Sequence, residues 1–178
     1  MLGRMSGVFY RDLGFSHADI ANVAKLYGVT ALIIGGISGG VLASRMGLLK
    51  ALLISGILMA ATNLSYAWLA VAGNDFPVFV FAVVSDQLTA GMATTTFVAY
   101  LSSLCNSAYS ATQYALLASA GNFARIIYAS ASGFIITALG GSWSIFFIAT
   151  AAASIPGLLL LFWMIRRLPP PKITQSAE

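Results

Sequence analysis

The chain has 178 residues, of which 59% are hydrophobic and only 8% are charged, whereas about 25% of the residues in a typical soluble domain are charged. So few charges could not cover the surface of a water-soluble fold of this length, and the composition excludes that class. The formal net charge is +4, but the basic residues are scattered at the ends of apolar stretches, which argues against a nucleic-acid partner. The single cysteine, Cys105, excludes an internal disulfide bond and a multi-cysteine metal site. We expect no metal and no cofactor.

The beginning of the chain, residues 1–22, is predicted to be a polar segment outside the cytoplasm. It contains Arg4 and Arg11 and lacks the apolar core of a cleavable signal peptide. The only histidine, His17, lies in this segment.

Long uncharged runs follow, and they predict helices that cross a membrane. A helix needs about 20 apolar residues to span a bilayer, so the runs 26–44 and 51–74 each predict one span. The runs 87–124 and 126–165 are too long for one helix, and turns are expected inside them at 105–111 and 140–142. The predicted fold class is an all-α polytopic membrane protein whose bundle covers 23–165, with about five spans at 23–43, 50–72, 77–103, 112–138 and 143–165.

The end of the chain, residues 166–178, is predicted to be a mobile cytoplasmic tail, because its prolines prevent a helix. Cytoplasmic loops of membrane proteins carry an excess of basic residues. The orientation with the most basic residues inside puts three of them outside (Arg4, Arg11 and Lys25) and five inside (Arg45, Lys50, Arg166, Arg167 and Lys172).

The first span contains a glycine-rich run in which glycines recur four residues apart, at Gly35, Gly36, Gly39 and Gly40. Such spacing allows the backbone of a neighbouring helix to approach closely, so these residues are predicted to serve helix packing. The run also contains the G-x-S-x-G pattern of some serine hydrolases. Ser38 would need a base within hydrogen-bond reach, but it lies about 22 Å of helix away from the segment that holds His17. We therefore expect no enzymatic activity.

Asp86 and Arg125 lie deep within predicted spans. A charged group near the middle of a bilayer costs at least about 2.5–3.5 kcal/mol, so such groups are usually buried, paired and functional. Counted along their helices, the two reach similar depths on consecutive spans, and a contact between them would be geometrically feasible. The pair could be a purely structural ion pair, or it could handle a substrate or a proton.

Uncharged polar side chains in the same two helices are suited to hydrogen-bonding a sugar or a peptide, and each could equally join two helices. They are Gln87, Gln113, Tyr114 and Asn122. Apart from Lys50 at the first position, the spans 50–72 and 143–165 carry no charged residue, and we expect them at the periphery of the bundle.

Residues 39–50, GGVLASRMGLLK, resemble the cytoplasmic loop signature G-G-x-L-a-D-R-x-G of the major facilitator superfamily. Arg45 and Gly47 match the signature, whereas Ser44 stands where an acidic residue is usual. Four longer segments, 9–28, 51–70, 96–117 and 151–163, resemble the second half of muropeptide permeases of the AmpG type. These permeases belong to the peptide and acetyl-coenzyme-A transporter branch of that superfamily.

The resemblance implies import of anhydromuropeptides across the bacterial inner membrane, driven by protons, for peptidoglycan recycling. It also implies that a first half and most of one helix are missing, so that the chain is expected to be a C-terminal fragment. The expected partners are the lipid bilayer, the solute, protons and the missing N-terminal half. The alternatives are a transporter of another bulky polar solute, such as acetyl-coenzyme A, and a membrane interaction protein that does not transport.

Overall fold

The computed structural model describes residues 2–105, 110–138 and 143–167, apart from the side chains of 2–6, 110, 124, 125 and 128–138. The described part contains helices and no strand. In chain order these are α1 (Leu2–Asp12), α2 (His17–Asn22), the π-helical segment η1 (Val23–Gly28), α3 (Val29–Met46), α4 (Leu48–Ala72), α5 (Phe76–Leu104), α6 (Ser110–Ala138) and α7 (Trp143–Arg167).

The membrane character of the chain follows from these helices. Among the described residues, four continuous stretches are long and apolar enough to cross a bilayer: His17–Met46, Leu48–Ala72, Phe76–Leu104 and Trp143–Arg167. The predicted span 112–138 coincides with α6, whose residues would extend for about 43 Å. The predicted all-α polytopic fold is confirmed, and the chain is a multi-pass membrane protein. The main difference in bounds is that the first long helix begins at His17 rather than at residue 23.

Residues 1–22, predicted to be a polar segment outside the cytoplasm, are largely helical. They contain α1 and α2, and Phe9, Tyr10 and Phe15 are only 0, 7 and 6% exposed. The physical reason is that α1 is amphipathic, so its aromatic side chains pack inward while Arg11 remains exposed. The expected turn at 140–142, most of the turn at 105–111 and the tail after Arg167 lie outside the described residues.

Two connections between helices are short and have a clear local cause. Gly47 joins α3 to α4 with a φ of 87°, a conformation that favours glycine and explains the residue at this place. Between α4 and α5, the side chain of Asp75 accepts a hydrogen bond from the N–H of Val78 at 3.4 Å and caps α5. Pro77 follows in the first turn, where a missing N–H costs nothing.

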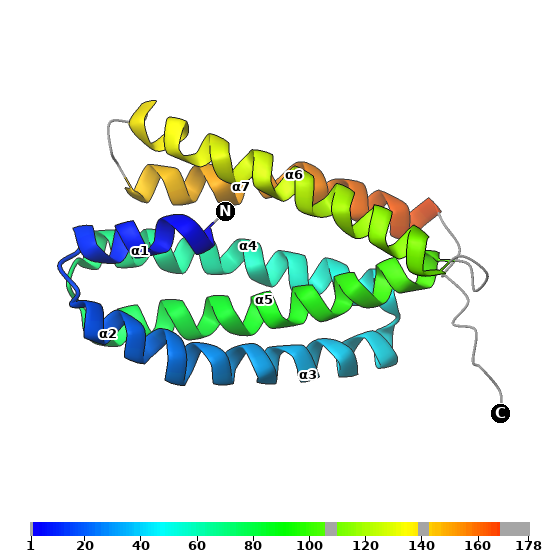
Figure 1. The fold of residues 1–178 in the computed structure, drawn as a ribbon, viewed down its shortest axis with the longest axis horizontal. Helices are drawn as coiled ribbons and strands as arrows, with labels where there is room; N and C mark the ends of the chain where they lie inside the picture. Colours follow the sequence, from blue (N-terminus) through cyan, green and yellow to red (C-terminus); the bar gives the residue numbers. More distant parts are fainter. Residues whose placement is uncertain (1, 106–109, 139–142, 168–178) are drawn as a thin grey trace.

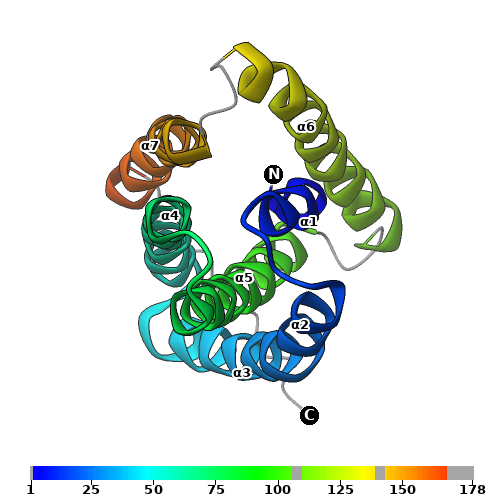
Figure 2. The same cartoon turned by 90° about the vertical axis from the view of Figure 1, so that its left-hand side faces the viewer.

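The helices form an arc when the bundle is viewed from one end (Figure 2). α5 packs between α3 and α4, and α4 packs in turn against α7. α1 lies on the inner side of this arc, with α6 beyond it. Within the candidate spans, α5 has the largest share of buried residues and α7 the smallest. The low burial of α7 agrees with the peripheral position expected for it.

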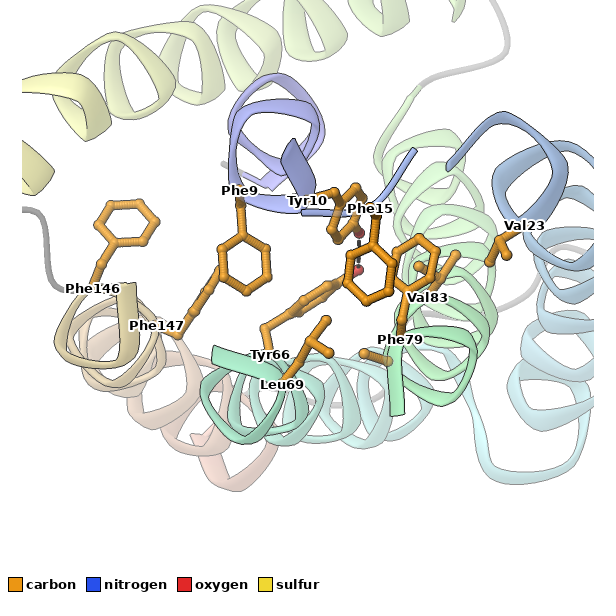
Figure 3. Packing of buried hydrophobic residues seen from close by; sticks show 11 residues of the cluster. Phe9, Tyr10, Phe15, Val23, Tyr66, Leu69, Phe79, Val83, Phe146 and Phe147 are labelled. Atoms are coloured by element: carbon orange, nitrogen blue, oxygen red, sulfur yellow. Dashed lines mark hydrogen bonds between the residues drawn. The ribbon is translucent and has the colours of Figure 1, made fainter. Parts of the chain in front are cut away.

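Aromatic side chains fasten α1 to the bundle at one end (Figure 3). The ring of Phe9 lies 4.9 Å from that of Phe147 on α7, and the ring of Tyr10 lies 4.8 Å from that of Phe79 on α5. Such pairs contribute about 0.5–1.5 kcal/mol each beyond the area that they bury. We call this group the aromatic cluster; it consists of Phe9, Tyr10, Phe15, Tyr66, Phe79, Trp143, Phe146 and Phe147.

Candidate functional site

Asp86 lies in the first half of α5, about 15 Å from the beginning of that helix. The hydroxyl of Tyr66 on α4 donates a hydrogen bond to Asp86 Oδ2 at 3.3 Å. The hydroxyl of Tyr10 on α1 donates in turn to the hydroxyl of Tyr66 at 3.1 Å, shown as a dashed line in Figure 3. We call these three residues the Tyr10–Tyr66–Asp86 chain. Its two hydrogen bonds connect α1, α4 and α5 and end at the carboxylate of Asp86.

This carboxylate and its partner are shielded from the surface. Tyr66 is only 2% exposed, and Asp86 itself is half-buried. An ionised carboxylate offers acceptors only, and it needs donors or a proton when water is excluded. The two tyrosines supply a donor without adding a charge, so Asp86 keeps the capacity to bind a proton or a donor group of a solute.

Further hydroxyl pairs continue from Asp86 along the contact between α4 and α5. Thr62 Oγ1 lies 3.4 Å from Thr89 Oγ1, and Ser55 Oγ lies 3.1 Å from Thr96 Oγ1. Together with the contact of Tyr66 and Asp86 they form a polar seam between the two helices. These four hydroxyl residues are buried.

The polar seam corrects the peripheral position expected for span 50–72. That expectation counted ionisable groups only, but α4 packs on both sides and contributes hydroxyl groups to the interior. A signal was present, because Ser55, Thr62 and Tyr66 recur at intervals of seven and four residues and so share one face of a helix. The helical spacing of these hydroxyl residues could therefore have identified the face of α4 that contacts α5.

Removing one hydroxyl of the seam should have a small effect on stability. For Thr96→Val we expect the free energy of unfolding to fall by about 0.6 kcal/mol, the average for an interhelical hydrogen bond in a membrane. The effect is small because Ser55 Oγ also donates to the Ala51 carbonyl oxygen of its own helix at 2.9 Å. Denaturation in mixed micelles measures the change. Thr150→Val is the matched control, since the hydroxyl of Thr150 donates to the Phe147 carbonyl oxygen of its own helix, and an equal loss there would contradict the interhelical contribution.

The other predicted site residues lie on different surfaces. Gln87 is half-buried and faces η1, where a Cβ built on Gly28 would lie 3.5 Å from Gln87 Cγ. Gln113 and Tyr114 are half-buried near the start of α6, and Asn122 is exposed farther along it. The backbone of Arg125 belongs to α6, but its side chain lies outside the described part. A contact between Asp86 and Arg125 therefore stays a prediction, and the structure joins Asp86 to Tyr66.

The glycines of the first span lie where α3 crosses α5. A Cβ on Gly35 would overlap the carbonyl oxygen of Leu88, and a Cβ on Gly39 would lie 2.8 Å from Met92 Cα. Gly36 and Gly40 face Thr95 more loosely, with Cβ distances of 3.3 Å to Oγ1 and 3.9 Å to Cγ2. The two sets differ because only Gly35 and Gly39 point directly at the backbone of α5. Arg45 is exposed in the last turn of α3.

Ser38, the serine of the G-x-S-x-G pattern, bonds within its own helix. Its hydroxyl donates to the Gly35 carbonyl oxygen at 2.9 Å. His17 begins the continuous helical stretch His17–Met46, which places it about 30 Å along the axis from Ser38. The structure does not bring this serine and this histidine together.

Known proteins resemble the chain over most of its length. It is 39% identical to the anhydromuropeptide permease of Escherichia coli over 85% of the chain and 30% of the permease. It is 34% identical to the AmpG 4 protein of Rickettsia felis over 94% of the chain and 40% of that protein. It is 35% identical to the AmpG 3 protein of Rickettsia prowazekii over 92% of the chain and 38% of that protein.

The chain thus spans well under half the length of these relatives. The sequence profile of the Major Facilitator Superfamily matches residues 5–178, which is nearly the whole chain. The chain belongs to the major facilitator superfamily.

Proposed function

We propose that this chain forms part of a proton-coupled importer of anhydromuropeptides in the bacterial inner membrane, which serves peptidoglycan recycling. The observation that carries the proposal is the 39% identity to the anhydromuropeptide permease of E. coli. Asp86 supports it, because a carboxylate inside an apolar span suits the binding of a proton or of a polar solute.

Transport by this superfamily takes place between two halves. Its members bind their solute near the middle of the bilayer at the contact of structural repeats, and the halves rock against each other. The relatives have additional length that the chain does not cover, and we expect that length to supply the opposing half of the binding site. Asp86 would then contribute a polar group of this half, and Gln87, Gln113, Tyr114, Asn122 and Arg125 stay further candidates for contact with the solute.

The orientation in the membrane gives a separate prediction. The end of α3, the beginning of α4 and the end of α7 lie at the same end of the bundle (Figure 1), and they carry Arg45, Lys50, Arg166 and Arg167. We expect this end to face the cytoplasm. With Cys105 replaced by serine, Ser44→Cys should resist a membrane-impermeant maleimide in intact cells. Asn74→Cys, at the exposed turn between α4 and α5, should react strongly, and the reverse pattern would invert the orientation.

Uptake of radiolabelled anhydromuropeptide tests the proposed function. The chain is expressed alone and also joined to the N-terminal part of the E. coli permease, in a strain that lacks its own permease. We expect the joined protein to import the solute and a protonophore to abolish import. Uptake of acetyl-coenzyme A instead would favour the alternative transporter. If correctly inserted protein takes up neither solute, the transport proposal is wrong and a membrane interaction protein is favoured.

A further inference from the structure

The Tyr66 hydroxyl occupies the middle of the Tyr10–Tyr66–Asp86 chain. It accepts a hydrogen bond from Tyr10 and donates its own hydrogen to Asp86 Oδ2. Because Tyr10 takes up an acceptor position of this oxygen, it favours the orientation in which the Tyr66 hydrogen points to the carboxylate. Both hydrogen bonds therefore point in the same direction, from Tyr10 on α1 through Tyr66 on α4 to Asp86 on α5.

The ring of Tyr66 is held by its neighbours. It stacks on Phe147 of α7 at 5.4 Å and lies edge-on to Phe9 of α1 at 6.3 Å (Figure 3). Rings packed in this way cannot swing without moving a neighbouring helix. The position of the hydroxyl that reaches Asp86 thus depends on both α1 and α7.

α1 is also tied to α7 directly. Trp143 Nε1, at the start of α7, donates to Asp12 Oδ2 at the end of α1 at 3.2 Å. α1 lies on the inner side of the arc of helices (Figure 2), so it is placed to transmit a movement on that side to the outer helices. Among the described residues, α1 contacts the bundle through the aromatic cluster, through the hydrogen bonds of Tyr10 and Asp12, and through close approaches to α2 and α6.

We propose that Tyr66 is a positioning residue for Asp86 and that Tyr10 makes this positioning depend on the placement of α1. With α1 docked, the carboxylate of Asp86 accepts the hydrogen bond from the Tyr66 hydroxyl. When α1 shifts, Tyr10 withdraws and the hydrogen bond loosens, so Asp86 must be satisfied by a proton or by a donor of the solute. Movement of α1 is thereby linked to what Asp86 binds. The inference rests on the proposed function, in which Asp86 is a binding group.

The test compares two activities of the protein that imports radiolabelled anhydromuropeptide. One is uptake driven by an imposed pH gradient, and the other is counterflow, the exchange of labelled for unlabelled solute without a gradient. For Tyr66→Phe, which keeps the ring and removes only the hydroxyl, we expect gradient-driven uptake to fall about tenfold because a hydrogen bond to a charged group is lost. Counterflow should stay within about twofold of the parent, since binding and rocking of the protein persist.

Tyr10→Phe should also lower gradient-driven uptake, by about threefold, because it indirectly weakens the hydrogen bond from Tyr66 to Asp86. The double variant should be no worse than Tyr66→Phe alone, since residues that act through one another are not additive. Tyr27→Phe is the matched control, because Tyr27 is 53% exposed on η1, and it should leave both activities unchanged. The uptake of each variant is normalised to the amount of its protein in the membrane, which is measured with a fluorescent tag.

Three results would overturn the inference. Tyr66→Phe could accumulate solute like the parent, it could lose counterflow as strongly as driven uptake, or the two single effects could multiply in the double variant. Asp86→Asn separates this outcome from failure of the proposed function. If Asp86→Asn abolishes driven uptake while Tyr66→Phe does not, only the positioning role is wrong. If Asp86→Asn leaves driven uptake intact, Asp86 is not a binding group, and the inference fails while the proposed function stands. If no form of the protein imports the solute, the proposed function fails and the inference fails with it.

Discussion

Replacing Gly35 with alanine is expected to lower the free energy of unfolding by about 3 kcal/mol, at the upper end for overpacking of a tightly packed interior. The added Cβ would overlap the carbonyl oxygen of Leu88, which belongs to the backbone of α5 and cannot rotate away. The two helices would have to separate, and the contacts along their shared surface would weaken. Denaturation of the purified chain in mixed micelles measures the loss.

Gly40→Ala is the matched control for this change. It lies in the same helix, but its Cβ would be 3.9 Å from Thr95 Cγ2, an ordinary contact. Its stability should be unchanged or raised by up to about 1 kcal/mol, because alanine favours a helix more than glycine does. Equal losses for the two variants would show that glycine at these positions serves something other than the close crossing of α3 and α5.

Asp86→Asn is expected to abolish accumulation of anhydromuropeptide against its gradient. One proton carried with each solute supports about a tenfold accumulation per unit of pH difference, since one pH unit corresponds to about 1.36 kcal/mol. Asparagine can still receive the hydrogen bond from Tyr66 but cannot take up a proton. The ratio of internal to external solute should therefore fall from about ten to about one under a gradient of one pH unit, as measured in vesicles.

Asp75→Asn provides the control for the loss of a carboxylate. Asp75 lies at the exposed start of the same helix, where asparagine also serves as an N-cap, so accumulation should not change. Arg125→Gln and the double variant with Asp86→Asn separate function from structure. If neutralising both residues together restores folding and accumulation, the two form only a structural ion pair, and the functional role of Asp86 is wrong.

Most of the architecture was predictable from the sequence, because crossing a bilayer is a local requirement. Each span has to be long, apolar and helical by itself, since lipid offers no hydrogen bonds to the backbone. The charge-free runs therefore located four of the long helices to within two residues at each end, whereas the first long helix begins six residues before its predicted span. The first 22 residues escaped this argument, because α1 is short and is held by aromatic contacts with distant parts of the chain.

The candidate site was predictable only in part. Asp86 stood out because a carboxylate within an apolar run is costly wherever its helix faces. Its partner did not stand out, since Tyr66 lies inside a span whose interior carries no charged residue and Tyr10 lies before the first predicted span. A hydrogen bond between residues 56 positions apart depends on how each helix is rotated about its axis and where it crosses its neighbours.

By itself, then, the sequence determined that the chain is a helical membrane protein, where its long helices run and which carboxylate lies inside one of them. Tertiary structure decided that α4 turns its hydroxyl groups toward α5, that α1 lies on the inner side of the arc, and that two tyrosines connect α1 to Asp86. The physical reason is that hydropathy acts on each residue separately, whereas the meeting of side chains is set by the packing of whole helices.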